Sequence, residues 1–195
     1  MEFTSYDSVI KCITEECLTN YREKDVIHPM DLAIHLMKCP QMKMHCPQHH
    51  YLIPAVLLTA SYKLQGRPVE MLQDGLMEAM LRAKNVLAGF CGLYGSCGAA
   101  VGLGIFSSIL LDATPHSVET WAITNRIVAE SLLKISEING PRCCKRNSFI
   151  ALLHAEEFLR EQLGLDLGVS EPICCEFYSQ NQDCKKTECP FFPIH

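Results

Sequence analysis

The sequence predicts an all-α protein, a single bundle-like domain with a buried glycine-rich central helix and a cysteine-rich C-terminal tail. Apolar residues recur every three or four positions along most of the chain, and no segment alternates as a strand would. The 195 residues, 48% of them hydrophobic, suffice for one well-buried core plus a small appendage. We therefore expect a helical domain over residues 1–168 and a metal- or cluster-binding tail over 169–195, packed on that domain.

Three helices are expected in the first third of the chain. The apolar face of the first consists of Tyr6, Val9, Ile10, Ile13 and Cys17, so Cys17 is expected in the core. The second begins at Pro29, because proline suits a first helical position, and stops at Cys39-Pro40. The third runs over residues 51–64, with Pro54 tolerated within its first turn.

Four further helices are expected before the tail. A stripe of Val69, Leu72, Leu76 and Met80 marks one, and residues 97–111 form the glycine-rich central helix, whose glycines permit close approach of a neighbouring backbone or cofactor. A last long helix runs from about residue 147 to Gly164. Between the central helix and the last helix lies the one whose apolar residues have the most regular helical spacing. Its inward stripe is expected to be Val118, Trp121, Ala122, Asn125, Val128, Ala129, Leu132 and Ile135.

Twelve cysteines are best interpreted as ligands or redox groups in the cytoplasm. The first residues are polar and acidic and show no secretory signal, so disulfide staples are not expected. Residues 86–111 are apolar, but their glycines and cysteines predict a loop and a buried helix, so we expect no membrane association. The net charge of −5 argues against nucleic acid as a partner.

The first candidate cluster is His45, Cys46, His49 and His50, directly before a helix. Ligands four residues apart project from one helical face, so His45 with His49 and Cys46 with His50 are candidate metal-binding pairs. The alternative is that the histidines cap the helix and bond to loops.

Cys91 and Cys97 form the second cluster, in a glycine-rich turn that leads into a helix. The positive end of a helix dipole favours a thiolate, which makes Cys97 a candidate ligand or nucleophile. A tight turn with two buried thiols is the structural alternative.

The third cluster is Cys143-Cys144, flanked by Arg142, Lys145 and Arg146. These cations are expected to lower the pKa of both thiols and to make them reactive, unless the basic side chains are simply solvated. Both thiols are therefore candidate catalytic groups as well as ligands.

The tail provides the strongest metal-binding pattern. Cys175, Cys184 and Cys189 lie in a Cys-x8-Cys-x4-Cys-Pro run, with Cys174 as a spare thiol. A segment too short for its own core needs an ion or cluster to fold, and either an iron–sulfur cluster or tetrahedral zinc would serve.

Residues 49–58, 89–102 and 140–146, together with the tail run ending in Pro-Phe-Phe, resemble an uncharacterised prokaryotic family of cysteine-rich domains. The resemblance covers nearly the whole chain. It implies an anaerobic setting and a radical-SAM protein, fused or neighbouring, as a possible partner, but it assigns no catalyst.

Three functions remain open on these residues. The leading hypothesis is an iron–sulfur protein, with a [4Fe–4S] cluster that handles sulfur transfer or redox chemistry on a small-molecule or sulfur-containing substrate. Its cofactor-binding residues would come from Cys91, Cys97, Cys143, Cys144, Cys175, Cys184 and Cys189, with His45 and His49 as further metal ligands and His49 or His50 as acid or base. The alternatives are a zinc-binding accessory domain that docks on a radical-SAM partner, and a dithiol redox or soft-metal-handling protein centred on Cys143-Cys144.

Overall fold

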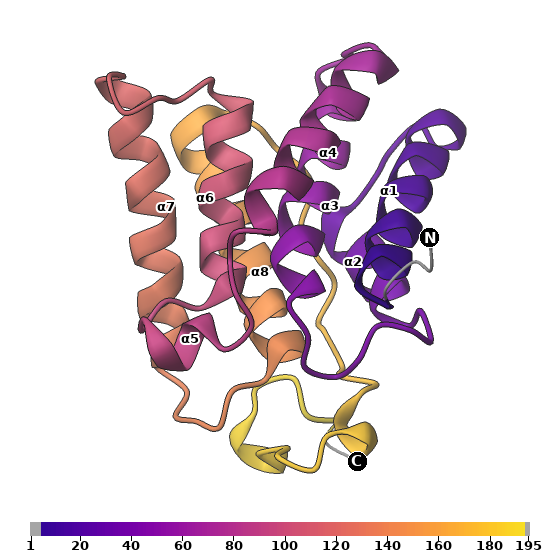
Figure 1. The fold of residues 1–195 in the computed structure, drawn as a ribbon, viewed down its shortest axis with the longest axis vertical. Helices are drawn as coiled ribbons and strands as arrows, with labels where there is room; N and C mark the ends of the chain where they lie inside the picture. The colour runs from indigo at the N-terminus through magenta and orange to yellow at the C-terminus, as the bar shows by residue number, and fades with distance from the viewer. Residues whose placement is uncertain (1–4, 194–195) are drawn as a thin grey trace.

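The computed structural model describes residues 5–193, and these form one all-α domain in which no strand occurs (Figure 1). The helices are α1 (Ser5–Glu23), α2 (Pro29–Met37), α3 (Gln48–Leu64), α4 (Val69–Ala83), α5 (Phe90–Leu93), α6 (Gly98–Leu110), α7 (Glu119–Ser136) and α8 (Cys144–Leu163). The described tail contains only two 3-10 turns, η1 (Tyr178–Gln180) and η2 (Lys186–Glu188). The predicted fold class is confirmed.

Helix α3 lies at the centre of the bundle, in contact with α1, α2, α4, α6 and α8. Every residue from 48 to 62 is buried, and the helix starts three residues earlier than its expected first residue. Pro54 therefore lies beyond the first turn, where its missing N–H leaves the carbonyl of His50 without its usual helical donor.

The glycine-rich helix α6 packs closely against this part of α3. A Cβ at Gly98 would lie 2.1 Å from the His50 ring, and one at Gly102 would lie 2.9 Å from Cβ of Ile53. Since neither position admits a side chain, the glycines fix the distance between the two helices. The prediction of a buried glycine-rich helix is confirmed, although α3 is the more enclosed of the two.

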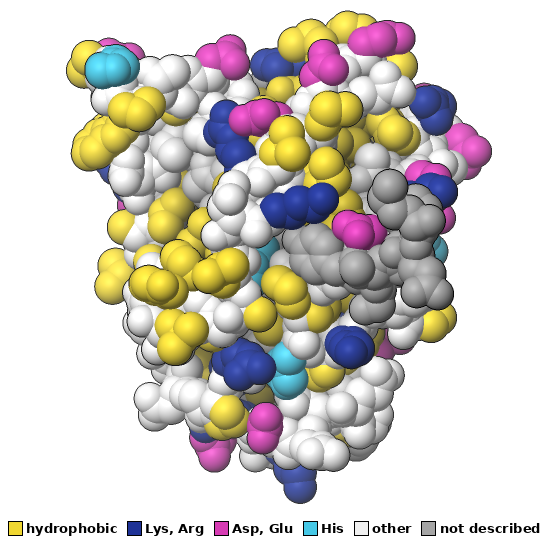
Figure 2. Space-filling view, viewed as in Figure 1, with side chains coloured by type: hydrophobic (Ala, Val, Ile, Leu, Met, Phe, Trp, Pro, Cys, Tyr) yellow, Lys and Arg dark blue, Asp and Glu magenta, His cyan; other side chains and the backbone are white. Residues whose placement is uncertain are grey.

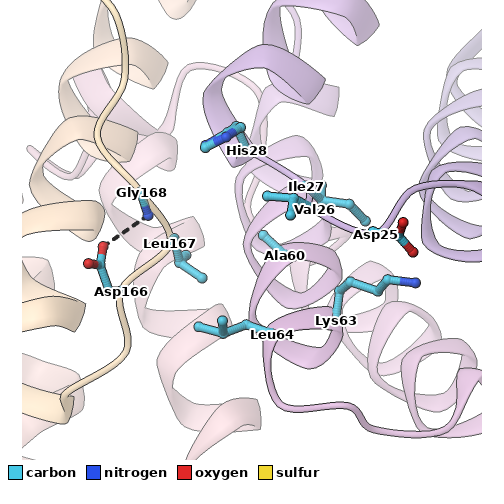
Figure 3. Close-up of a pocket in the computed structure, with 10 residues that line it drawn as sticks. All are labelled: Asp25, Val26, Ile27, His28, Ala60, Lys63, Leu64, Asp166, Leu167 and Gly168. Atoms are coloured by element: carbon cyan, nitrogen blue, oxygen red, sulfur yellow. Dashed lines mark hydrogen bonds between the residues drawn. The ribbon is translucent and has the colours of Figure 1, made fainter.

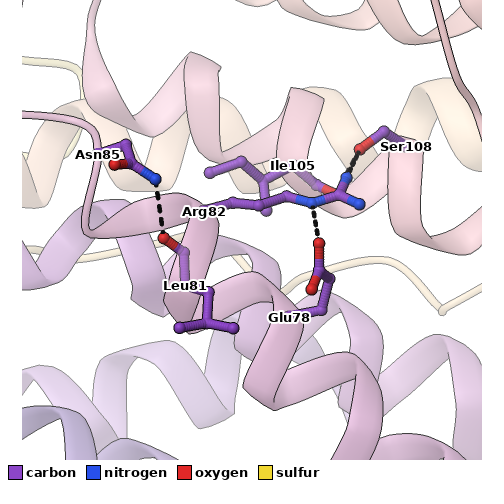
Figure 4. A network of polar contacts seen from close by, with 6 residues as sticks. All are labelled: Glu78, Leu81, Arg82, Asn85, Ile105 and Ser108. Atoms are coloured by element: carbon purple, nitrogen blue, oxygen red, sulfur yellow. Dashed lines mark hydrogen bonds and ion pairs between the residues drawn. The ribbon is translucent and has the colours of Figure 1, made fainter.

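Helix α4 is held against α6 by a polar contact at the protein surface (Figure 4). Nε of Arg82 donates to Glu78 at 2.7 Å, one turn earlier on the same helix, and its Nη1 donates to Ser108 of α6 at 2.6 Å. The predicted apolar stripe of α4 packs inward, with Leu72 and Leu76 fully buried.

Helix α7 packs on the core with only part of the stripe predicted for it, since Val128 and Ile135 contact the core as expected. Val118, Trp121, Ala122, Asn125 and Ala129 are exposed, whereas Ile127 and Ser131 are buried. The cause is the contact with α6, where Gly104 leaves room for Val128 and so sets the rotation of α7. Figure 2 accordingly shows hydrophobic side chains gathered on the left of the molecule, the side where α7 lies.

The other boundaries agree with the sequence. Cys17 on α1 is fully buried, α2 begins at Pro29, and α8 ends at Gly164, whose φ of +64° is the left-handed conformation of a helix C-cap. The side chain of Tyr6, predicted on the apolar face of α1, lies outside the described residues. No helix in the described part of the chain is both long and apolar enough to cross a membrane.

Candidate metal centre

Four cysteines from two distant segments line one small cavity at the N-terminus of α8. Cys143 lies at the N-cap of that helix, and the other three come from the tail: Cys175, Cys184 and Cys189. We call these four residues the tail group. The cavity has a volume of about 20 Å³ and is walled by Phe149, Tyr178, Phe191 and Phe192.

Hydrogen bonds hold the tail group in place. The backbone N–H of Cys175 donates to the carbonyl of Phe191 at 2.7 Å, which closes the tail on itself. The buried amide of Asn181 lies with Nδ2 3.7 Å from Sγ of Cys143 and with Oδ1 3.3 Å from Nε2 of His45. His45, a predicted ligand, therefore adjoins the tail group through Asn181.

A second set of thiols lies on the other side of the α8 N-terminus. Burial is the largest cause that raises the pKa of Cys144 to about 12. Negative charge on Cys97 and Cys46 contributes to this rise and a backbone hydrogen bond from Cys46 opposes it, so both residues lie close enough to Cys144 to affect its titration. We call Cys46, Cys97 and Cys144 the groove group. Cys97 also accepts a hydrogen bond from Nδ2 of Asn147 at 3.3 Å.

Cys97 of the groove group lines an open hollow on the described surface. This groove, of about 590 Å³, is lined by Cys97 and by Cys91 from α5, and its far wall is the apolar side of α7 around Leu132. No charged side chain lines it. Cys91 is thus separated from the tail group and shares only this groove with Cys97.

The consecutive cysteines belong to different groups, and neither thiol is activated as predicted. Burial raises the pKa of both thiols, because a thiolate is disfavoured away from water, and at Cys143 this effect exceeds the opposing charge of Arg146. Lys145 and Arg146 are buried, whereas Arg142 is exposed. The expectation of low-pKa thiolates in the metal-free chain was therefore wrong.

Lys145 and Arg146 are buried beside the thiols without any acidic partner. Lys145 is 1% exposed, donates to the carbonyl of Met37 at 3.2 Å and lies 4.7 Å from the ring centroid of Phe177. Arg146 is 4% exposed and donates to the carbonyl of Pro141 at 3.2 Å. In the described part of the chain, neither cation has a carboxylate within ion-pair distance.

Burial lowers the pKa of Lys145 to about 8. Thiolate charge on Cys46, Cys144, Cys143 and Cys175 opposes this lowering. Lys145 is therefore electrostatically coupled to thiols of both groups.

The two predicted catalytic histidines occupy different settings. His49 donates from Nδ1 to the carbonyl of Cys46 at 3.0 Å and lies 3.2 Å from its Sγ, while the buried Nε2 has no partner. Burial and the charge of Lys145 lower the pKa of His49 to about 3, so the ring stays neutral and offers a lone pair. His50 donates to the carbonyl of Val86 at 2.9 Å and packs on Gly98, which makes it a link between α3 and α6.

Sequence reasoning missed some contributors to this region. Cys46 was recognised beside the histidines but not included among the cluster ligands, because nothing in its spacing connects it to Cys144, about a hundred residues later. Asn147 and Asn181 gave no signal at all. The tail was expected to pack on the helical domain; its thiols adjoin the N-terminus of α8, whereas Cys97 at the start of α6 lines the groove.

The remaining cysteines lie apart from both groups. Cys17 belongs to the core, Cys174 is exposed, and Cys12 lies with its Sγ 3.6 Å from that of Cys39. Within residues 5–193, no three His, Cys, Asp or Glu side chains already surround a common point as the ligands of an ion do. Within each group, the thiol side chains would therefore need to rotate toward one another to bind a common metal ion.

A further cavity of about 150 Å³ lies away from the thiols (Figure 3). It is lined by the loop of Asp25 and His28, the end of α3, and Asp166, which accepts a hydrogen bond from the backbone of Gly168 at 3.0 Å. It contains no cysteine, so neither thiol group extends to this cavity.

Fold and site together define a cysteine-rich all-α protein with two thiol groups at one helix terminus. The chain belongs to the family described as "Family of unknown function (DUF5714)", whose model matches residues 13–192. A search of curated proteins and a search of solved structures each found no match.

Proposed function

We propose that the protein binds an iron–sulfur cluster through thiolates at the α8 N-terminus and uses it in sulfur transfer or redox chemistry. The observation that carries this proposal is the burial of Lys145 and Arg146 beside the two thiol groups without a carboxylate. A buried, unpaired cation costs several kcal/mol, so its position calls for a nearby negative charge. Ligated thiolates would supply that charge.

The groove group suits a cluster with one open position. Cys46, Cys97 and Cys144 are three thiols, and three thiolates on a [4Fe–4S] cluster leave one iron free to bind substrate. The groove beside Cys97 has the volume of an ordinary small-molecule site. Its uncharged lining favours a small, uncharged or sulfur-containing substrate.

His49 would act here as a ligand or as a positioning group. In its neutral ring the unpartnered Nε2 carries a lone pair that can bind a metal, while Nδ1 donates a hydrogen bond to the carbonyl of Cys46. His50 supports the site indirectly, since its contact with Gly98 places the beginning of α6 and hence Cys97.

A second candidate function rests on the tail cavity, which favours a single ion. A volume of about 20 Å³ accommodates roughly one atom the size of a water, and four thiols closed off by aromatic rings resemble a structural zinc site. On this alternative the chain is a zinc-binding accessory domain that docks on a radical-SAM partner. Cys143 and Cys144 face different groups, so we do not propose the dithiol function.

The cellular setting is part of the same proposal. An iron–sulfur cluster with an open iron is best preserved without oxygen, which fits the cytoplasm of an anaerobe, and a radical-SAM protein is the proposed partner. The exposed apolar face of α7, with Trp121 and Leu133, is the surface we propose for that contact.

The test is anaerobic purification followed by iron, sulfide and zinc analysis and absorption spectroscopy. We expect iron and sulfide in the wild-type chain, their loss in Cys97→Ser and Cys144→Ser, and their retention in Cys174→Ser, which removes an exposed thiol outside both groups. Zinc that is lost only in Cys184→Ser would identify a separate ion in the tail group. A colourless wild-type chain without stoichiometric iron would refute the iron–sulfur proposal.

A further inference from the structure

Outside both thiol groups, α1 and the end of α2 bring together four side chains of the types that bind zinc. Cys12 and Glu16 are four residues apart on α1, and His35 and Cys39 are four residues apart across the end of α2. The backbone N–H of Cys39 donates to the carbonyl of Leu36 at 3.1 Å, three residues earlier, so Cys39 lies in a turn that directly follows α2. Cys12 and Glu16 project from one face of α1, as paired metal ligands do. The turn places Sγ of Cys39 against that of Cys12.

The contacts between the two pairs have the lengths found around a tetrahedral ion. Sγ of Cys12 lies 3.6 Å from Sγ of Cys39, and Oε2 of Glu16 lies 3.6 Å from Nε2 of His35. Bonds of about 2.3 Å to sulfur place two zinc-bound thiolates roughly 3.8 Å apart, and bonds of about 2.0–2.1 Å place nitrogen and oxygen roughly 3.4 Å apart. Both observed contacts are close to these values.

The side chains are free to complete the arrangement. His35 is 65% and Glu16 is 41% exposed, and an exposed pair of this kind contributes little to stability and restrains neither partner. Among the described residues the four donors do not yet surround one point. Binding would therefore require His35 and Glu16 to turn toward the thiols, and Sγ of Cys39 to give up its hydrogen bond to Oε1 of Gln41 at 2.9 Å. The two thiols already touch.

From this geometry we infer a zinc site formed by Cys12, Glu16, His35 and Cys39. Binding converts both thiols to thiolates and releases two protons to solvent, while the carboxylate and the neutral imidazole bind as they are. Four protein ligands leave no open position, so the ion is structural and joins α1 to α2. It also anchors the beginning of the 38–47 segment, which carries Cys46 of the groove group.

The experiment compares zinc content in full-length chains equilibrated anaerobically at a fixed free zinc concentration. Cys12→Ser and His35→Ala should each contain about one zinc equivalent less than wild type, with iron and sulfide unchanged. His116→Ala, which changes an exposed histidine far from the site, should match wild type. Since His35 is exposed, its variant reports on binding even where Cys12→Ser impairs folding.

Two results would overturn the inference: zinc content unchanged in His35→Ala, or a Cys12–Cys39 disulfide where the ion should be, detected by mass spectrometry. Failure here is distinguishable from failure of the proposed function. The iron–sulfur proposal stands or falls on iron and sulfide, whereas this site is measured by zinc lost on changing residues of α1 and α2.

Discussion

The tail group and the groove group share the N-terminus of α8 but differ in their surroundings. The tail group is closed by four aromatic rings around about 20 Å³, whereas the groove group borders an open hollow of about 590 Å³. Closed thiol sites are typical of structural ions and open ones of reactive centres. On the functions proposed above, the tail group would stabilise the fold of the tail and the groove group would carry the chemistry.

The largest expected effect separates the groups by their consequences for folding. The tail has only two three-residue turns and few buried apolar side chains, so a bound ion would supply most of its folding energy, on the order of 10 kcal/mol for structural zinc. We expect Cys184→Ser to make residues 169–193 sensitive to limited proteolysis while helices α1–α8 keep their circular dichroism. Cys97→Ser should leave the tail protected; equal sensitivity in both variants would remove the distinction.

Gly98→Ala should destabilise the fold by disturbing the contact between α6 and α3 beside the groove group. The new Cβ would overlap the His50 ring at 2.1 Å, so the beginning of α6 must move, at a cost of about 3 kcal/mol in unfolding free energy. Urea denaturation measures this loss. Gly92→Ala, where no atom lies within 4 Å, is the matched control and should change stability by less than about 0.5 kcal/mol.

Lys145→Met should affect both groups, because this lysine is coupled to thiols of each. Removing an unpaired buried cation should stabilise the metal-free chain by about 1–2 kcal/mol and weaken metal retention roughly tenfold. Chemical denaturation and chelator competition measure the two effects. Lys24→Met, at an exposed position, should change neither. A destabilised metal-free chain would contradict the electrostatic argument.

The smallest expected effect is the pH dependence of folding stability that comes from His154, a residue of α8 away from the thiols. Burial lowers the pKa of His154, so the folded chain holds it neutral. Its stabilising contribution is complete above pH of about 6.5 and is lost on acidification, by up to about 1.4 kcal/mol per pH unit, until the lowered pKa is reached. His154→Gln should flatten the stability profile below pH of about 6.5, whereas His116→Gln should not.

The sequence predicted the helices far better than the relations between them. Periodicity and proline or glycine boundaries located α2, α6 and the end of α8 almost to the residue, because these signals are local. Helix α8 begins at Cys144, three residues before its expected start. The inward face of α7 was predicted only in part, since the rotation of this helix depends on Gly104 of another helix. An apolar stripe reports which side could be buried, not which side meets a neighbour.

The candidate site was predictable as parts rather than as an arrangement. Each of the four clusters was visible as a run of cysteines or histidines, but no spacing rule shows that Cys144 lies beside Cys46 while Cys143 lies beside Cys184. The raised pKa values of Cys143 and Cys144 could not be predicted from the sequence either. It depends on burial by segments that are distant in sequence.

Because Cys143 and Cys144 are consecutive, a single peptide unit serves both groups. A metal bound by one group would restrict the backbone torsions between Cys143 and Cys144. Binding at the other group would then cost less conformational entropy. Reciprocity then requires the second to tighten the first by the same factor. Loading of the two centres would be cooperative, and a partly filled chain would be the scarcest species.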